Sequence, residues 1–167
     1  MINDMKKFLT IAAAIICLCS CAAFRLTPAQ EAKIAEAVAD SLSQRHYTID
    51  ITRIYPRRGP SRVVDGFRLK VNGDKVDSYL PFIGVAYSVD YGSQSNGMSF
   101  ESTIDEYYFN IPSPDRKQIQ FTTRNGNDQL MFTIIVFDNG LSDITVVSRN
   151  RETISYSGEL RTPVPEK

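Results

Sequence analysis

The sequence predicts a mainly β, α+β domain in which one N-terminal helix packs on an antiparallel sheet of about seven or eight strands. Three observations predict it: an apolar stripe with a four-residue spacing near the N-terminus, two-residue alternation through most of the rest, and short turn motifs between the alternating segments. Such a sheet must bury one face. A sheet curled over the helix, a closed barrel and a two-layered sandwich all satisfy this requirement, and the sequence leaves all three open.

The helix is marked by a capping box. Thr27 is the expected N-cap, Pro28 takes the first helical position, and Gln30 lies three residues after the cap. The apolar stripe that follows consists of Ile34, Val38 and Leu42. A stripe with this spacing predicts that one side of the helix packs on the sheet.

Alternation begins near Tyr47 and is clear at residues 67–71 (FRLKV). Asn72-Gly73 predicts a type I′ hairpin turn, and Asn125-Gly126 and residues 138–140 (DNG) predict two more turns. Residues 130–137 (LMFTIIVF) are apolar or β-branched almost throughout, which predicts a central strand covered on both faces. Ile154, Tyr156 and Leu160 mark the last strand.

One segment breaks the alternation. Its apolar residues are even-numbered as far as Ile104 and odd-numbered from Tyr107 onward. A strand cannot change faces without an extra residue, so the pattern predicts a bulge near Asp105-Glu106.

The N-terminus has the pattern of a bacterial lipoprotein signal. Lys6 and Lys7 precede an apolar stretch, residues 8–18, that is shorter than the roughly 20 residues needed to span a bilayer. Small residues then lead to Cys21, and cleavage between Ser20 and Cys21 would leave Cys21 for lipid attachment. An ordinary secretory signal is the alternative, and either Met1 or Met5 can be the start.

Cleavage would change both the charge and the thiol content of the 167-residue chain. It takes Lys6 and Lys7 from the 19 basic residues and Asp4 from the 19 acidic ones, so acidic residues exceed basic residues by one. That balance excludes the positive excess of a typical nucleic-acid binder and leaves lipid as the expected link to the membrane. Cys17 and Cys19 would leave with the signal, and Cys21 would carry the lipid.

The expected organisation is a signal peptide (residues 1–20), a lipidated tether (21–27), one globular β-rich domain (28–160) and a C-terminal tail (161–167). The sequence predicts no metal site, no cofactor and no assigned catalytic residue, since one His and no Cys remain for them. His46 is expected as a C-terminal helix residue that suits the helix dipole. A hydrolase using His46, Asp105 or Glu106 is the alternative, although adjacent strand residues normally point to opposite faces.

Two segments could bind a partner. Arg53, Arg57, Arg58 and Arg62 form a basic cluster, for which a solvated loop is the expected role. An apolar stretch, residues 80–87 (LPFIGVAY), leads into a polar, glycine-rich loop. Loops on rigid scaffolds often carry binding residues. The candidate binding residues of this loop are Tyr87, Asp90, Tyr91, Gln94 and Asn96.

The same stretch carries a family resemblance. Residues 80–87, 55–59 (YPRRG) and 154–158 (ISYSG) resemble a Bacteroidetes lipoprotein family classed as domain of unknown function 4251, over about residues 28–160. The resemblance implies a small extracytoplasmic β-rich domain behind a lipoprotein signal, and it implies no catalytic residues. Phe82-Ile83 and Val85 depart from the residues that are common in that family.

Together these observations favour a lipid-anchored cell-envelope protein, on the periplasmic side of the outer membrane, that acts as a non-enzymatic binding or scaffold module. Its expected partners are the membrane, through lipid on Cys21, and a small molecule or an envelope protein. A small extracytoplasmic hydrolase is the alternative.

Overall fold

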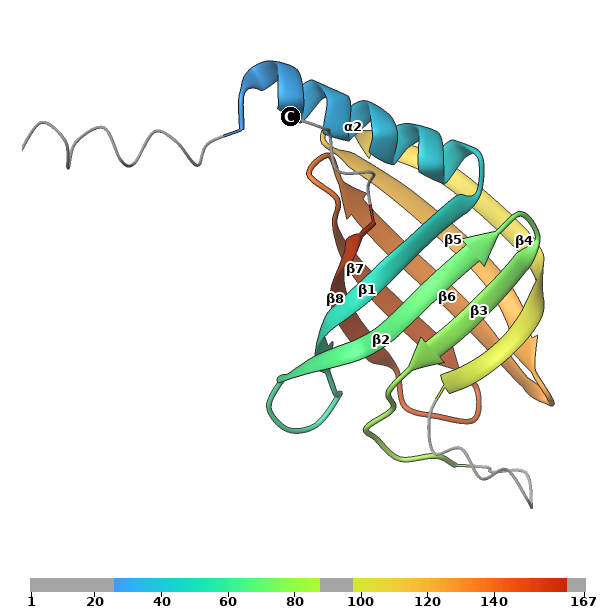
Figure 1. The fold of residues 1–167 in the computed structure, drawn as a ribbon. Coiled ribbons are helices and arrows are strands. Elements are labelled where there is room, and N and C mark those ends of the chain that lie inside the picture. The colour runs from blue at the N-terminus through green and yellow to red at the C-terminus, as the bar shows by residue number, and fades with distance from the viewer. Residues whose placement is uncertain (1–25, 88–97, 162–167) are drawn as a thin grey trace, which may run out of the picture.

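The computed structural model describes residues 26–87 and 98–161, and in it one helix is followed by an antiparallel barrel that closes on itself (Figure 1). Each strand pairs with its neighbour in sequence, and β8 pairs with β1 to close the barrel. The predicted fold class is therefore confirmed, and the barrel is the form that the sheet takes. The elements are α2 (Pro28–Ser43), β1 (His46–Tyr55), β2 (Arg62–Asn72), β3 (Lys75–Leu80), β4 (Met98–Ser113), β5 (Arg116–Asn125), β6 (Asp128–Phe137), β7 (Leu141–Ser148) and β8 (Ile154–Leu160).

Helix α2 begins at the predicted capping box. The Thr27 hydroxyl accepts a hydrogen bond from the Gln30 backbone N–H, and the Gln30 side chain accepts one from the Thr27 backbone N–H. Val38 and Leu42 are fully buried and Ile34 is partly buried, so the predicted stripe packs onto the barrel. The helix ends at Ser43, so His46 is the first residue of β1, and its predicted position in the helix was wrong.

The three predicted turns lie at hairpins of the barrel, but the one turn whose type was predicted has a different geometry. Asn72 pairs with Lys75, and Asn125 pairs with Asp128, so the two-residue loops are 73–74 and 126–127. Only the glycine has a positive φ in each loop, 61° at Gly73 and 60° at Gly126. Glycine at the first central position is typical of a type II′ turn, and the predicted type I′ turn at Asn72-Gly73 was wrong.

Strand β6 also differs from the prediction. Its residues alternate between buried and partly buried side chains, because the barrel is a single layer whose outer face has no second layer over it. The outward-facing residues of β6, including Met131 and Ile135, are therefore half-buried by their neighbours on the wall rather than covered.

The barrel interior is filled by side chains. The phenyl rings of Phe121 and Phe132 stack with their centroids 4.7 Å apart, and Tyr107 stacks on Phe121 at 6.3 Å. An eight-stranded barrel is just wide enough for side chains to fill its interior. The largest side chains that are less than 2% exposed are Tyr156, Phe121, Phe132, Leu42, Ile49, Ile51, Ile54, Leu69, Leu80, Met98, Ile119 and Leu130.

The two ends of the barrel have different covers. The helix end carries α2 and the turns at 73–74, 114–115 and 138–140. The loop end carries the connections after β1, β3, β5 and β7, and its described part includes residues 81–87 and 149–153. These two names are used below.

Candidate functional site

Strand β4 is longer than its neighbour β3 and extends beyond it at the helix end. The pairing of β3 with β4 ends at Lys75 and Thr103, and one further backbone bond joins the Ile104 N–H to the Asp74 carbonyl. Pairing of β4 with β5 continues to Ser113 and Arg116. Residues 105–113, which we call the β4 rim, therefore pair on one side only among the described residues.

A bulge separates the rim from the rest of β4. The register with β5 shifts between Ile104 and Glu106, which confirms the predicted bulge. Because of this shift, Ile104 and Tyr107 can both face the barrel interior. A second shift lies between Asn110 and Ser113, where Pro112 precedes the hairpin.

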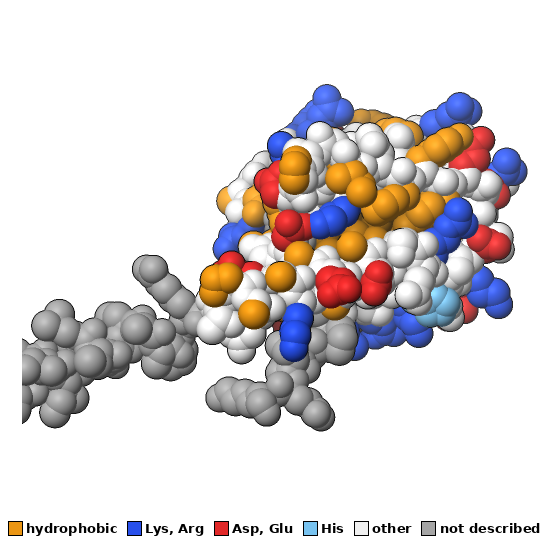
Figure 2. Space-filling view, turned by 90° about the horizontal axis from the view of Figure 1, so that it is seen from above, with side chains coloured by type: hydrophobic (Ala, Val, Ile, Leu, Met, Phe, Trp, Pro, Cys, Tyr) orange, Lys and Arg blue, Asp and Glu red, His pale blue; other side chains and the backbone are white. Residues whose placement is uncertain are grey.

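The rim exposes three large apolar side chains. Tyr108 is 60% exposed, Ile111 57% and Phe109 39%. Figure 2 looks onto the helix end and shows hydrophobic side chains gathered in a band beside the helix. Neighbouring exposed apolar side chains are typical of a surface that contacts a partner.

Helix α2 meets the rim at Tyr107. The Tyr107 hydroxyl donates a hydrogen bond of 3.5 Å to the Leu42 carbonyl, and the Arg45 guanidinium lies 4.3 Å from the centre of the Tyr107 ring. Arg45 itself has a left-handed backbone (φ 54°), a conformation that disfavours L-residues. The helix is thus held to the rim by ring contacts and a long hydrogen bond.

A buried hydroxyl at this junction lacks a well-formed hydrogen bond. Among the described residues, the Tyr47 hydroxyl, which is buried inside the helix end, has no partner in full hydrogen-bond geometry, although the Tyr107 hydroxyl is close enough to interact with it. Burial and, secondarily, the neighbouring Tyr107 raise the pKa of Tyr47 well above its usual value. Burial also raises the pKa of Tyr107, and Tyr47 and Arg45 partly offset that rise.

The loop end is closed by hydrogen bonds instead. Buried Glu152 accepts a bond from the Val85 backbone N–H at 3.2 Å, and the Val85 carbonyl accepts one from the Glu152 N–H at 3.0 Å. Ala86 forms a β-bridge with Arg151. These contacts fasten residues 81–87 across the end of the barrel.

Two further groups of bonds complete this closure. The Tyr156 hydroxyl, inside the barrel, donates a 2.7 Å bond to the Pro81 carbonyl, and burial raises the pKa of Tyr156. The Ser148 hydroxyl lies 2.8 Å from both carboxylate oxygens of buried Asp128, and Arg151 lies 3.6 Å from the same carboxylate. The loop end therefore satisfies its buried polar groups through bonds between loops and strands.

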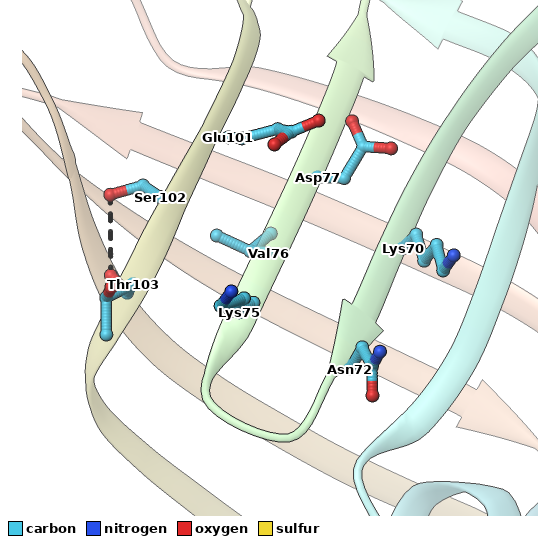
Figure 3. A pocket seen from close by; sticks show the side chains of 8 residues that line it. All are labelled: Lys70, Asn72, Lys75, Val76, Asp77, Glu101, Ser102 and Thr103. Carbon is cyan, nitrogen blue, oxygen red and sulfur yellow. Dashed lines mark hydrogen bonds between the residues drawn. The ribbon is translucent and has the colours of Figure 1, made fainter.

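The outer wall carries an open hollow of about 370 Å³ over β2, β3 and β4 (Figure 3). Its side chains include Lys70, Lys75, Asp77 and Glu101, and Asp77 lies directly opposite Glu101 on the neighbouring strand. Arg68 offsets this like-charge pair through an ion pair with Asp77 at 3.7 Å. The mixture of exposed charges of both signs describes a solvated wall better than a ligand site.

His46 does not come together with the predicted carboxylates Asp105 and Glu106, which are exposed neighbours at the bulge of β4. His46 begins β1 and its Nδ1 lies 3.2 Å from the Gln44 carbonyl, whereas Asp105 lies on β4 and pairs with Arg124 at 3.3 Å. Three strand spacings separate β1 from β4, about 14 Å along the wall, and general acid–base catalysis needs direct hydrogen-bond reach. The geometry gives no support to a site built from these residues.

The predicted basic cluster lies at the loop end. Arg53 donates a hydrogen bond to the Ser61 hydroxyl, and Arg58 reaches the carboxylate of Glu152 at 3.5 Å. Arg57 is exposed, and Arg62 opens β2. These residues border the polar closure of the loop end.

Of the predicted binding-loop residues, only Tyr87 is among the residues that the structure describes. Tyr87 is 64% exposed, and its backbone N–H donates to the Asn150 carbonyl. Asp90, Tyr91, Gln94 and Asn96 lie outside the described residues, as do Ser20 and Cys21. The binding loop and the lipid site therefore stay predictions.

The described residues hold neither a metal cluster nor a membrane-spanning helix. They contain no group of three or more His, Cys, Asp or Glu side chains placed to hold a metal ion. Within the same residues, no helix combines the length and the apolar character required to cross a membrane.

The sequence prediction missed the rim residues as a site. Tyr108, Phe109 and Ile111 look like ordinary strand residues, and only the bulge marked the segment as unusual. The missing information was the length of β3, because the open side of β4 exists only where β3 has ended.

The fold defines a small, closed, eight-stranded antiparallel barrel with a helix over one end. The model of the family described as a domain of unknown function (DUF4251) matches residues 29–160, and the chain belongs to this family. The chain is similar to a crystal structure of a DUF4251 family protein from Bacteroides eggerthii, with 15% sequence identity and a TM-score of 0.61, over 80% of this chain and 92% of that one. No curated protein matches the sequence.

Proposed function

We propose that the protein is a lipid-anchored cell-envelope module that binds another envelope protein at the β4 rim. In this proposal lipid on Cys21 holds it to the periplasmic side of the outer membrane, and the barrel is a rigid scaffold. One observation carries the binding role: the barrel interior is filled, while the exposed apolar side chains Tyr108, Phe109 and Ile111 lie on the part of β4 that has no strand beside it on one side.

A filled interior argues against a carrier of small molecules, since such carriers enclose a cavity of a few hundred Å³. An apolar cluster on the outside suits a protein partner better. The tether supports a position near the membrane, because the six residues from Ala22 to Thr27 span at most about 20 Å when extended.

The anchor is tested by metabolic labelling with a radioactive fatty acid and by membrane fractionation. We expect Cys21→Ser to abolish labelling and to release the protein from membranes. Cys19→Ser is the matched control and is expected to keep both. Membrane association that persists in Cys21→Ser would contradict the anchor.

The binding role is tested by reversible crosslinking in intact cells followed by quantitative mass spectrometry. Ile111→Asp puts a charge on the rim, and Val63→Asp puts the same charge on an exposed valine (72%) near the loop end. We expect at least one envelope protein to be captured by the wild type and by Val63→Asp but lost from Ile111→Asp. Equal capture by all three forms would contradict the rim as a binding surface.

A further inference from the structure

Resting on the proposed function, we infer that the β4 rim binds an extended, basic segment of its partner as an added strand. The first evidence is the unpaired backbone on one side of the rim. β3 supplies partners for β4 only as far as Thr103, and no backbone hydrogen bond from another described element reaches residues 105–113 on that side. A strand with one open side is a template for an extended peptide.

The side chains of the rim would supply specificity. Successive residues of a strand face opposite sides, so Tyr107 and Phe109 share the side toward the barrel interior, and Tyr108 faces outward. The helix lies beside the first part of the rim, where the Tyr107 hydroxyl donates a hydrogen bond to the Leu42 carbonyl. An added strand would therefore place alternate side chains in the apolar band between rim and helix.

Charge selects a basic segment. Asp105 and Glu106 begin the rim, and α2 contributes the exposed carboxylates of Glu31, Glu36 and Asp40 against a single lysine, Lys33. In two nearby ion pairs the charges already neutralise each other, Asp105 with Arg124 at 3.3 Å and Arg45 with Asp74 at 3.1 Å. The remaining charges, on Glu106 and on the exposed side of α2, are mainly acidic, which complements Lys or Arg in the partner and disfavours an anionic lipid surface.

The size of the open edge favours a short segment over a second copy of the chain. The register shifts on either side, at Asp105 and after Asn110, leave residues 106–110 as the regular part of the edge, about 17 Å long, and Pro112 beyond it lacks an N–H. Stable protein interfaces bury about 1,600 Å² in total. An edge of this length suits a peptide of a few residues, and the bulge and the proline also limit unselective strand pairing.

Three peptides test the inference on the full-length chain purified in detergent. The probe is Lys-Val-Thr-Val-Thr-Val-Lys; the controls replace both lysines with glutamate, or the central valine with proline. Binding is measured by fluorescence anisotropy, and the bound state by hydrogen exchange of the backbone amides. We expect the probe to slow exchange within residues 105–113, the glutamate peptide to bind at least about tenfold more weakly, and the proline peptide to lose the protection.

Variants separate the rim from the rest of the surface. Ile111→Asp should weaken probe binding by about tenfold or more, and Val63→Asp should leave it unchanged. Three results would overturn the inference: no binding of the probe, binding without slowed exchange at the rim, or rim protection produced only by phosphatidylglycerol vesicles or by raised protein concentration. In each case, loss of the crosslinked partner from Ile111→Asp in cells would still support the proposed function, so the two failures are distinguishable.

Discussion

The two ends of the barrel are closed by different kinds of interaction. At the loop end, backbone and carboxylate groups bond to each other, as in the paired bonds between Val85 and Glu152 and the bond from Tyr156 to Pro81. At the helix end, Val38 and Leu42 fill the opening, and the ion pair of Lys117 with Asp138 ties β5 to the neighbouring turn. Among the described residues, only the helix end leaves a buried hydroxyl without a well-formed hydrogen bond, at Tyr47.

This difference separates stability from binding in the molecule. The polar closure of the loop end uses its donors and acceptors internally. The apolar closure of the helix end reaches the β4 rim only at Tyr107, and the exposed side chains and unpaired backbone side of the rim beyond it remain available. We therefore expect substitutions at the loop end to act on stability and substitutions at the rim to act on binding.

The largest expected effect breaks the apolar closure. Leu42→Ala removes a fully buried side chain from the helix end, and such truncations cost about 2–5 kcal/mol of unfolding free energy. Urea denaturation measures the loss. Glu36→Ala, on the exposed side of the same helix, is the control and should stay within about 0.5 kcal/mol. A loss at Leu42 no larger than at Glu36 would show that the helix does not close the barrel.

The second-largest loss of unfolding free energy is expected when a hydrogen bond that closes the loop end is removed. Glu152→Ala removes the charged acceptor of the part-buried Val85 N–H, and a hydrogen bond to a charged group contributes about 1.5–3 kcal/mol. Hydrogen exchange should show faster exchange within residues 81–87, while the exchange of α2 stays unchanged. Glu152→Gln keeps an acceptor and should lose less. Equal losses in the two variants would mean that the carboxylate charge, rather than this bond, is what matters.

Tyr156→Phe removes one bond from the same closure. The Pro81 carbonyl then lacks its donor inside the protein, and we expect a loss of about 1–2 kcal/mol in the unfolding free energy. The aromatic ring remains, so the packing is kept. A neutral result in chemical denaturation would indicate that the bond to Pro81 contributes nothing to the closure of the loop end.

Tyr47→Phe, at the helix end, should change the unfolding free energy in the opposite direction from Tyr156→Phe. Removal of a buried hydroxyl that lacks a well-formed hydrogen bond should leave stability unchanged or raise it by about 1 kcal/mol. The pKa of Tyr47 is raised in the folded state, so ionisation of this group does not reduce the unfolding free energy below about pH 10, the unfolded value. Above that pH the unfolding free energy falls, because Tyr47 ionises more readily in the unfolded chain.

Denaturation at pH 8 and at pH 11 checks both parts of this prediction. Tyr47→Phe should reduce the loss of stability between the two values, because phenylalanine cannot ionise in the unfolded chain. A variant that is less stable than the wild type at pH 8 would mean that the Tyr47 hydroxyl has a stabilising partner.

The sequence was sufficient for the parts of the fold that depend on local patterns. The capping box at Thr27, the stripe that includes Val38 and Leu42, and the bulge at Asp105-Glu106 are all confirmed. Each is set by residues within a few positions of one another. The turn type at Gly73 was wrong because the register of β2 and β3, rather than the Asn-Gly pair alone, decides which residues form the loop.

Barrel closure and the site depended on long-range pairing. β1 and β8 pair although more than a hundred residues separate them, and nothing in either strand alone distinguishes a barrel from a sandwich. The rim arises from the unequal lengths of β3 and β4, which again is a property of a pair. Residues 80–87, which the sequence presented as the entry to a binding loop, also contribute to closing the loop end through Pro81 and Val85.

The central claim is that the helix end, rather than the loop end, meets the partner. The most direct test is site-specific photocrosslinking in intact cells, with a photoreactive residue at Tyr108 in one strain and at Tyr87 in another, since both side chains are about 60% exposed. The account predicts a discrete crosslinked envelope protein from position 108 and none from position 87. A crosslink from position 87 alone would contradict it and would favour the loop that the sequence indicated.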